Sequence, residues 1–244
     1  MSEKILTSPS ASPKRYDHAA WESKRRVLRF LIRVIGVNLL VKLDQVTGVE
    51  NVPAQGPAIL MINHIAFVDP IIVMHTLPRN IVPLAKIEVY NYPIIGLLPR
   101  LWGVIPVRRE EFDRRAVQQV MDVLRAGEIV LVAPEGTRSP ALQQGKEGVA
   151  YLSSRSQAPI VPVAIEGTIG YPALRGSKIW RSPGVRITFG PPFRFRQLER
   201  PPDREQLRKM TDEAMYILSA MLPETQRGVY ANLTQATQDT IEWI

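Results

Sequence analysis

Residues 62–70, INHIAFVDP, place a histidine and a carboxylate where the two could transfer a proton together. His64 closely follows the apolar run 58–62, which is typical of a buried strand, and Asp69 comes five residues later. A histidine held by a carboxylate is suited to take a proton from a hydroxyl group near neutral pH. His64 and Asp69 are therefore candidate catalytic residues.

The same two residues also have a purely structural interpretation. Asp69 precedes Pro70, and such a pair commonly starts an α-helix because the carboxylate caps the first turn and proline fits there. That interpretation does not account for His64, which would lie at the C-terminal end of a strand, where open α/β sheets place their ligand sites. The two interpretations stay open, since one Asp69 oxygen could cap the helix while the other orients His64.

A second segment, GVIPVRR (103–109), could bind an anion. In a strand, Gly103, Ile105, Val107 and Arg109 would share one face, while Arg108 would point to the other. Gly103 would leave space for a close approach, and Arg109 would leave the strand end as an anion ligand. The alternative is an ordinary strand that ends in a solvated Arg-Arg-Glu-Glu cluster.

A third segment, APEGTRS (133–139), directly follows an apolar strand and carries several polar groups. Gly136 permits a positive φ or a close backbone approach, and Thr137 follows it. Arg138 can bind a phosphate with two hydrogen bonds, and Glu135 can accept hydrogen bonds from hydroxyl groups or from that arginine. The alternative is a turn in which Glu135 and Arg138 only pair with each other.

These segments must be positioned by the elements between them. From residue 45 onward, short apolar runs alternate with longer helical patterns, which indicates β–α units. Strands are predicted at 58–63, 81–86, 103–108, 128–133, 160–165 and 185–189, and helices at 70–77, 111–126, 146–155 and 203–221. Glycine, proline and serine interrupt any period in residues 166–183, so we expect a long surface loop there. The predicted fold class is α/β, with a largely parallel mixed sheet flanked by helices and an N-terminal basic amphipathic helix.

The two ends of the chain differ from this middle part. Residues 1–17 are polar and rich in serine and proline, so we expect them to be disordered. Residues 18–43 combine arginines at helical spacing with a wide apolar face, which fits a helix lying in a membrane interface. Their uncharged stretch is far shorter than the roughly 20 residues that a spanning helix needs. The alternative is a helix that packs on the domain and solvates its arginines. Residues 223–244 form a tail with weak patterning.

Composition limits the classes of function. The chain has 244 residues, no cysteine, and 31 basic against 23 acidic residues, for a net charge of +8. Disulfides and thiolate chemistry are thereby excluded, and an anionic partner is favoured. No aromatic RNA-binding motif, zinc-ligand spacing or helix-turn-helix signature is present, so no nucleic-acid partner is expected. A metal-dependent hydrolase using His64, Asp69 and Glu135 would need more than the three histidines present, and no metal is expected.

Taken together, NHIAFVD, GVIPVRR and PEGTRS, followed by KEGVAYLS and IVPVAIEGT, resemble the conserved blocks of the glycerolipid acyltransferase family. The best-known members of this family are the bacterial 1-acylglycerol-3-phosphate acyltransferases. The resemblance covers roughly residues 46–192, in the order and approximate spacing of the family. It implies an acyltransferase domain over residues 44–222.

The resemblance also implies roles for individual residues. His64 would be the general base and Asp69 its partner. The substrate-binding residues would be Gly103, Arg109, Glu135, Gly136, Thr137 and Arg138, of which the first two belong to the block that binds the acceptor's phosphate. A role in binding the acyl donor, or a structural role, is implied for Asn63, Lys146 and Pro162.

The implied reaction moves an acyl group from acyl-CoA or acyl carrier protein to lysophosphatidic acid, without a cofactor. The implied location is the cytoplasmic face of the cytoplasmic membrane, where the protein would be peripheral or monotopic on an anionic surface. Ala66 stands where many members have serine, and Ala133 where an aromatic residue is common. Two alternatives therefore stay open. The acyl acceptor could be another lysolipid or an alcohol, or the chain could be a non-catalytic, basic lipid-binding protein.

Overall fold

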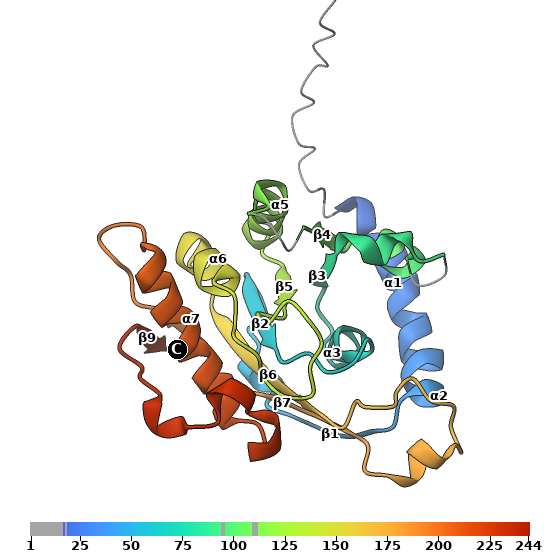
Figure 1. The fold of residues 1–244 in the computed structure, drawn as a ribbon. Coiled ribbons are helices and arrows are strands. Elements are labelled where there is room, and N and C mark those ends of the chain that lie inside the picture. The colour runs from blue at the N-terminus through green and yellow to red at the C-terminus, as the bar shows by residue number, and fades with distance from the viewer. Residues whose placement is uncertain (1–16, 18, 94–95, 109–111) are drawn as a thin grey trace, which may run out of the picture.

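The structure, a computed structural model, describes residues 17, 19–93, 96–108 and 112–244 (Figure 1). Its strands are β1 (Leu43–Thr47), β2 (Ala58–Ile62), β3 (Ile81–Lys86), β4 (Ile105–Val107), β5 (Ile129–Val132), β6 (Ile160–Glu166), β7 (Val185–Phe189), β8 (Phe193–Phe195) and β9 (Ile241–Trp243). Its α-helices are α1 (Ala19–Leu31), α2 (Asn38–Leu40), α3 (Asp69–Thr76), α4 (Leu97–Trp102), α5 (Arg114–Arg125), α6 (Gly148–Ser156) and α7 (Arg204–Ala220). Residues 1–17, which are predicted to be disordered, lie outside the described residues apart from Asp17.

One mixed sheet organises the described part of the chain, with the strand order β1-β7-β6-β2-β5-β3-β4. The strands from β6 to β4 are parallel to their neighbours, whereas β7 runs antiparallel to β6 and parallel to β1. Strand β8 extends the sheet beside β6, and β9 pairs with β8. The predicted α/β class with a largely parallel mixed sheet is confirmed.

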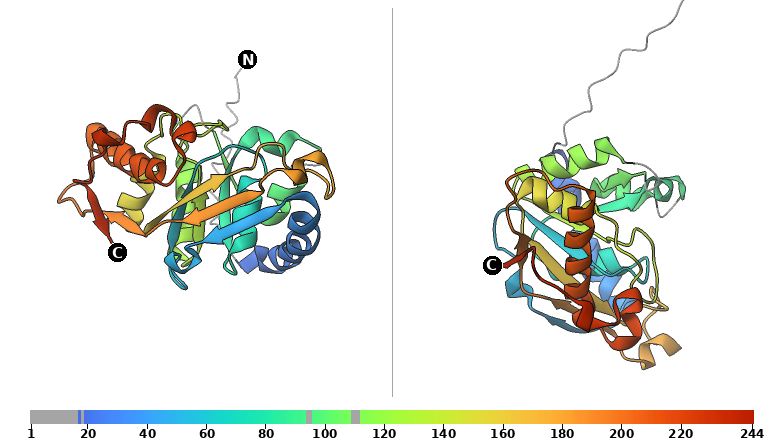
Figure 2. Two further views of the ribbon diagram at one scale, coloured as in Figure 1. Left: turned by 90° about the horizontal axis from the view of Figure 1, so that it is seen from below. Right: turned by 60° about the vertical axis from the view of Figure 1, so that its left-hand side comes forward.

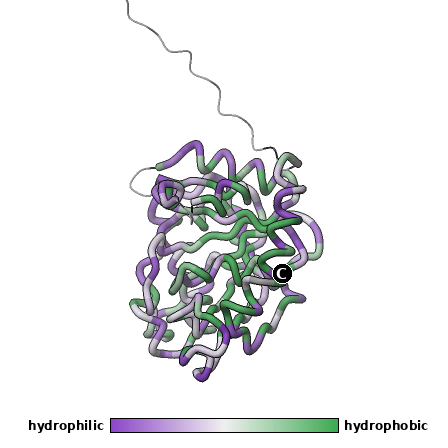
Figure 3. Tube along the Cα trace, turned by 90° about the vertical axis from the view of Figure 1, so that its right-hand side faces the viewer, coloured by the Kyte–Doolittle hydropathy of each residue, from purple (hydrophilic) through white to green (hydrophobic). Residues whose placement is uncertain are grey.

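Helices cover both faces of this sheet, which explains why its central strands are apolar throughout. Every residue of β2 (AILMI) and β5 (IVLV) is buried. Ile59 and Met61 pack under α5, α6 and α7, while Leu60 and Ile62 pack on the opposite side, under α3. Figure 2 shows the two helical layers from other directions, and Figure 3 shows hydrophobic stretches running through the middle of the molecule.

The predicted elements within the domain are found with small shifts at their ends. Two helices start where the sequence provides a cap: the Asp113 side chain accepts from the Ala116 N–H, and Asp203 forms a capping box with Gln206. Four elements, β1, β8, β9 and α4, were not predicted, since each is short and lies in a segment without clear periodicity. The predicted strand at 103–108 is shorter, because Gly103 ends α4 with a φ of 73°.

The single helix predicted over residues 18–43 is wrong in its extent. After α1 the chain forms wider π-helical turns over Ile32–Val37, a short α2, and then β1. The Asn38 amide donates to the carbonyls of Arg33 and Val34, groups that a regular α-helix would use for its own backbone. Strand β1 pairs with β7, so Leu43, the last residue of the predicted helix, belongs to the sheet.

The contacts of Arg25 show that α1 packs on the domain. Its side chain is fully buried, and its Nε donates to the carbonyl of Trp102 at 2.8 Å. The alternative interpretation of this segment, a helix that packs on the domain and solvates its arginines, is thus confirmed in its packing but wrong for the solvation of Arg25. No helix in the described part of the chain is long and apolar enough to cross a bilayer.

The C-terminal tail is also integrated into the fold. Glu213 of α7 is buried and accepts hydrogen bonds from Thr237, Asp239 and Thr240 of residues 223–244. Burying a carboxylate without such donors would cost free energy, so these hydrogen bonds stabilise the packing of the tail on α7. These hydrogen bonds hold the segment just before β9, which pairs with β8 at the edge of the sheet.

Candidate active site

His64 and Asp69 come together at the C-terminal end of β2, as the sequence predicts. The His64 Nδ1 lies 3.0 Å from an Asp69 Oδ2 that is fully buried. An ionised carboxylate can only accept a hydrogen bond, so in a pair of ionised Asp69 and neutral His64 the Nδ1 carries the proton and Nε2 keeps its lone pair. This is the protonation state in which a histidine can act as a base.

Asp69 does not cap α3, contrary to the structural interpretation of its position. Its Oδ2 accepts from the backbone N–H groups of Ile65 and Ala66, at 2.6 and 2.8 Å, as well as from His64. The side chain makes no capping bond at the start of α3. The carboxylate thus closes the loop between β2 and α3, and this closure fixes the imidazole.

Glu135 fixes the histidine from the other side. One carboxylate oxygen lies 3.4 Å from the His64 backbone N–H, and the other accepts from the Gln143 N–H at 2.8 Å. The Ser139 N–H in turn donates to the His64 carbonyl at 2.8 Å. Glu135 is buried and does not pair with Arg138; it connects the third segment to the first through the His64 N–H and does not merely hold its own turn together. Gln143 could not be predicted from the sequence, because only its backbone takes part.

Burial raises the pKa of the Glu135 carboxyl from 4.5 to about 7, although the hydrogen bonds from Gln143 and His64 oppose this shift. The folded state therefore binds a proton more tightly than the unfolded state between these two values. Consequently, the free energy of unfolding should fall as the pH rises from about 4.5 to about 7, by roughly 3 kcal/mol in total from this group.

Replacing this carboxyl tests the predicted pH dependence. Chemical denaturation at pH 5 and pH 7.5 should show that Glu135→Gln loses less stability than the wild type over this interval. Glu224→Gln, which changes an exposed side chain, is the control and should follow the wild type. Parallel pH profiles for all three proteins would show that Glu135 does not titrate in this range.

A cavity of about 230 Å³ lies in front of the dyad, between the ends of β2, β3, β4 and β5 and helix α6. Its polar lining comes from His64, Arg108 and Lys146, and the rest is largely apolar. The Lys146 side chain runs over Gly136, where an added Cβ would lie 3.4 Å from it. Gly136 has a φ of 67°, so the positive φ allowed at the sequence level is what the turn requires. Lys146, for which a donor-binding or structural role was predicted, thus lines the cavity.

The structure corrects two assignments in the GVIPVRR segment. Arg108 was predicted to point away from the site, but it lines the cavity with His64. Gly103 was predicted to make room for a ligand, but the Trp21 ring of α1 fills that space, 2.7 Å from the position of a Cβ. Strand β4 ends at Val107, so strict alternation does not extend to residue 108. Arg109 lies outside the described residues.

The remaining predicted residues do not line the cavity. Thr137 and Arg138 are exposed on the loop after β5. Asn63 is buried and pairs with both the N–H and the carbonyl of Ile165, at 2.8 Å each, so its role is to tie β2 to β6. Pro162 is buried in β6, where its carbonyl accepts from the Gly190 N–H.

A second cavity, of about 490 Å³, adjoins the first and shares five lining residues with it: Leu84, Val107, Lys146, Gly148 and Leu152. It lies between α5, α6 and α7, and Phe112 and Tyr151 contribute aromatic rings to its lining. Its surface is mainly apolar. The sequence predicted these helices, but not that their apolar faces leave a space beside the dyad.

The fold and the site define an α/β protein that carries a His–Asp dyad at the end of a parallel strand. A family model described as "Acyltransferase" matches residues 45–166, half of the chain. The chain belongs to this acyltransferase family.

Individual relatives agree with this assignment. The 1-acyl-sn-glycerol-3-phosphate acyltransferase of Borreliella burgdorferi is 30% identical over 148 residues, which are 59% of this chain and 57% of that protein. The enzyme of the same name from Bacillus subtilis is 27% identical over 164 residues, which are 67% of this chain and 80% of that protein. The chain thus spans little more than half of the first relative.

A solved structure shares the fold. The crystal structure of the 1-acyl-sn-glycerophosphate acyltransferase PlsC from Thermotoga maritima aligns with a TM-score of 0.57 and 24% identity. The alignment covers 79% of this chain and 78% of that one. This likeness concerns the arrangement of the elements.

Proposed function

We propose that this chain transfers a fatty acyl group from acyl-CoA or acyl carrier protein to the free hydroxyl of lysophosphatidic acid, which gives phosphatidic acid. The observation that carries the proposal is the His64 imidazole, which Asp69 holds by its Nδ1 while the ring lines a cavity with two cationic side chains. The family and the names of the two bacterial relatives support the same reaction.

His64 is the general base in this proposal. Its Nε2 takes the proton of the acceptor hydroxyl while that oxygen forms a bond to the thioester carbonyl carbon. The tetrahedral intermediate then collapses, the carbon–sulfur bond breaks, and the proton passes from His64 to the departing sulfur. Since a thioester is already activated, the reaction requires no metal ion, cofactor or covalent nucleophile.

The two cavities match the two parts of the substrates. Arg108 and Lys146 bring positive charge to the first cavity, where the acceptor's phosphate is bound in this proposal. The apolar second cavity, which opens beside it, accommodates an acyl chain. In this proposal, both groups lie within reach of His64.

The direct test is an acyl-transfer assay with the full-length protein, labelled acyl-CoA or acyl carrier protein, and lysophosphatidic acid in detergent micelles. We expect labelled phosphatidic acid to form. Lysophosphatidylcholine, lysophosphatidylglycerol and monoacylglycerol are compared in parallel, because acylation of one of them alone would assign the same chemistry to another acceptor. No transfer to any acceptor from either donor would contradict the proposal.

We also propose that the protein binds the cytoplasmic face of the membrane peripherally. Val27, Phe30, Leu31 and Val34 follow the i, i+3, i+4, i+7 pattern of one helical face, and each is between 42% and 64% exposed. Such a face next to a cationic one is typical of helices that lie in a membrane interface. Arg25 and Trp21 meanwhile hold the helix on the domain.

The apolar face can be tested without removing the helix. The triple change Val27→Ser, Leu31→Ser and Val34→Ser should weaken cosedimentation with phospholipid vesicles, because it removes exposed apolar area and leaves all charges in place. The control is Val229→Ser, which changes an equally exposed valine in the tail. Unchanged vesicle binding by the triple variant would place the membrane contact elsewhere.

A further inference from the structure

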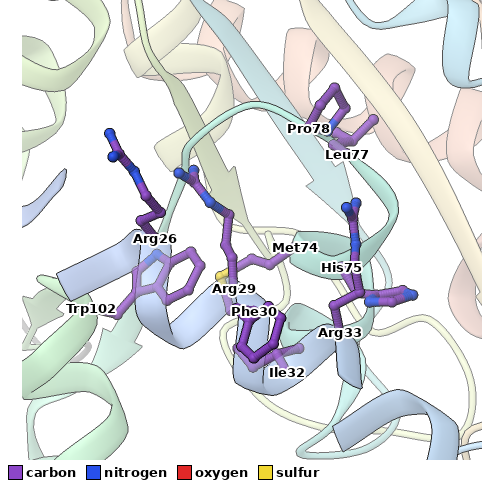
Figure 4. Close-up of a pocket in the computed structure, with 10 residues that line it drawn as sticks. All are labelled: Arg26, Arg29, Phe30, Ile32, Arg33, Met74, His75, Leu77, Pro78 and Trp102. Atoms are coloured by element: carbon purple, nitrogen blue, oxygen red, sulfur yellow. The ribbon is translucent and has the colours of Figure 1, made fainter. Parts of the chain in front are cut away.

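A third cavity, of about 270 Å³, lies between α1 and the end of α3 (Figure 4). Arg26, Arg29 and Arg33 line it from one side, and His75 lines it from the other. Its apolar lining includes Phe30 and Trp102. Neither the catalytic proposal nor the family assignment uses any of these groups.

The charges in this cavity are only partly compensated. Arg29 is held by Glu22 at 3.1 Å and also donates to Asn80. Among the described residues, no side chain or carbonyl accepts a hydrogen bond from the Arg26 or Arg33 guanidinium, and no carboxylate pairs with either. Three arginines around a small cavity therefore carry about two uncompensated positive charges. Guanidinium groups in this arrangement suit a phosphate, whose oxygens accept several hydrogen bonds at once.

His75 is the fourth polar residue of the lining. Its Nδ1 is buried and has no hydrogen-bond partner among the described residues. Burial and the neighbouring Arg33 lower the pKa of its imidazole, so the ring is neutral at pH 7. A neutral ring adds no repulsion toward the arginines and can donate one hydrogen bond to an anion.

This cavity is separate from the catalytic one. The two have no lining residue in common. Helix α3 lies between them: Asp69 at its start holds His64, while Met74 and His75 at its other end line the arginine cavity. The eight residues of this helix span roughly 12 Å.

We propose that the cavity formed by Arg26, Arg29, Arg33 and His75 is a non-catalytic binding site for a phosphate group, as carried by an anionic lipid headgroup or by a free phosphate. The apolar face of α1 favours the lipid, because Phe30 belongs both to that face and to the cavity lining. A lipid phosphate bound by the arginines would place its acyl chains along Phe30 and Val34. The inference does not depend on the proposed reaction.

The first test uses the histidine rings as reporters, since the chain contains only three histidines. The full-length protein is titrated with inorganic phosphate at constant ionic strength, and the ring signals are followed by NMR. We expect the His75 signals to shift and saturate, also in His64→Ala, which lacks the proposed base. Arg33→Ala should weaken the apparent affinity about tenfold or more, since a charge-assisted hydrogen bond is lost. Lys24→Ala removes the same charge from α1, outside the cavity, and should change the apparent affinity less than about twofold.

The second test distinguishes the two sources of phosphate. The same variants are compared in binding to neutral vesicles that contain a fixed mole fraction of phosphatidic acid or of phosphatidylglycerol. If Arg33→Ala loses clearly more binding than Lys24→Ala, the ligand is a lipid headgroup. If the two variants bind vesicles alike but differ tenfold toward inorganic phosphate, it is a free phosphate. If Arg33→Ala and Lys24→Ala weaken the binding of phosphate and of vesicles equally, the inference is overturned. The binding would then reflect only the general positive charge of the surface.

Discussion

Replacing His64 with alanine should lower the turnover number for acyl transfer by about two to four orders of magnitude, which is the usual contribution of a positioned general base. The imidazole lies at the end of β2 with its Nδ1 3.0 Å from Asp69, and alanine removes the whole group that would take the proton. Steady-state rates with saturating acyl donor and acceptor measure the loss. The fold should persist, because the Glu135 and Ser139 contacts involve the His64 backbone and remain.

Asp69→Asn separates the chemistry of the dyad from its position. An amide can still accept from the Ile65 and Ala66 N–H groups, but it cannot accept three hydrogen bonds as the carboxylate does. Where the amide NH₂ faces Nδ1 instead, the imidazole carries its proton on Nε2 and ceases to be a base. We therefore expect a large loss of turnover in a folded protein. Near-normal turnover by a folded His64→Ala protein would disprove the dyad.

Replacing Arg108 with alanine should raise the Michaelis constant for lysophosphatidic acid by about 10- to 100-fold, with a smaller effect on that for the acyl donor. The reason is that Arg108 lines the cavity that holds His64, and a hydrogen bond between charged groups is worth about 1.5–3 kcal/mol. Kinetics at varied acceptor and fixed donor concentrations measure this change.

Two comparisons make this prediction specific. Arg115→Ala removes an exposed arginine of α5 and should leave the Michaelis constants unchanged. Monoacylglycerol lacks the phosphate, so the rate with this weaker acceptor should be nearly the same in Arg108→Ala and the wild type. Arg109→Ala and Arg138→Ala, assigned to phosphate by resemblance, should be measured beside it. If either of these raises the Michaelis constant for lysophosphatidic acid while Arg108→Ala does not, that arginine binds the phosphate and Arg108 does not.

The sequence by itself determined the features that depend on local pattern. The continuous apolar runs of β2 and β5 indicate strands covered on both faces, and the parallel order of such strands places their ends together. The HxxxxD spacing across a strand–loop–helix junction allowed His64 and Asp69 to meet, and the resemblance to the family implied that they do. A positive φ at Gly136 could be anticipated for a similar reason, since glycine in a turn after a strand is favoured by its own conformational freedom.

The tertiary structure decided which partner each group has, because those partners lie far away in the sequence. Asp69 binds loop N–H groups and does not cap its helix, and Asn63 pairs with a strand about a hundred residues later. The space beside Gly103 is filled by Trp21 from α1, and Arg108 turns into the cavity because β4 ends one residue earlier. Short edge strands such as β1 and β9 form only because a sheet is present to pair with them, and no periodicity of their own encodes that pairing.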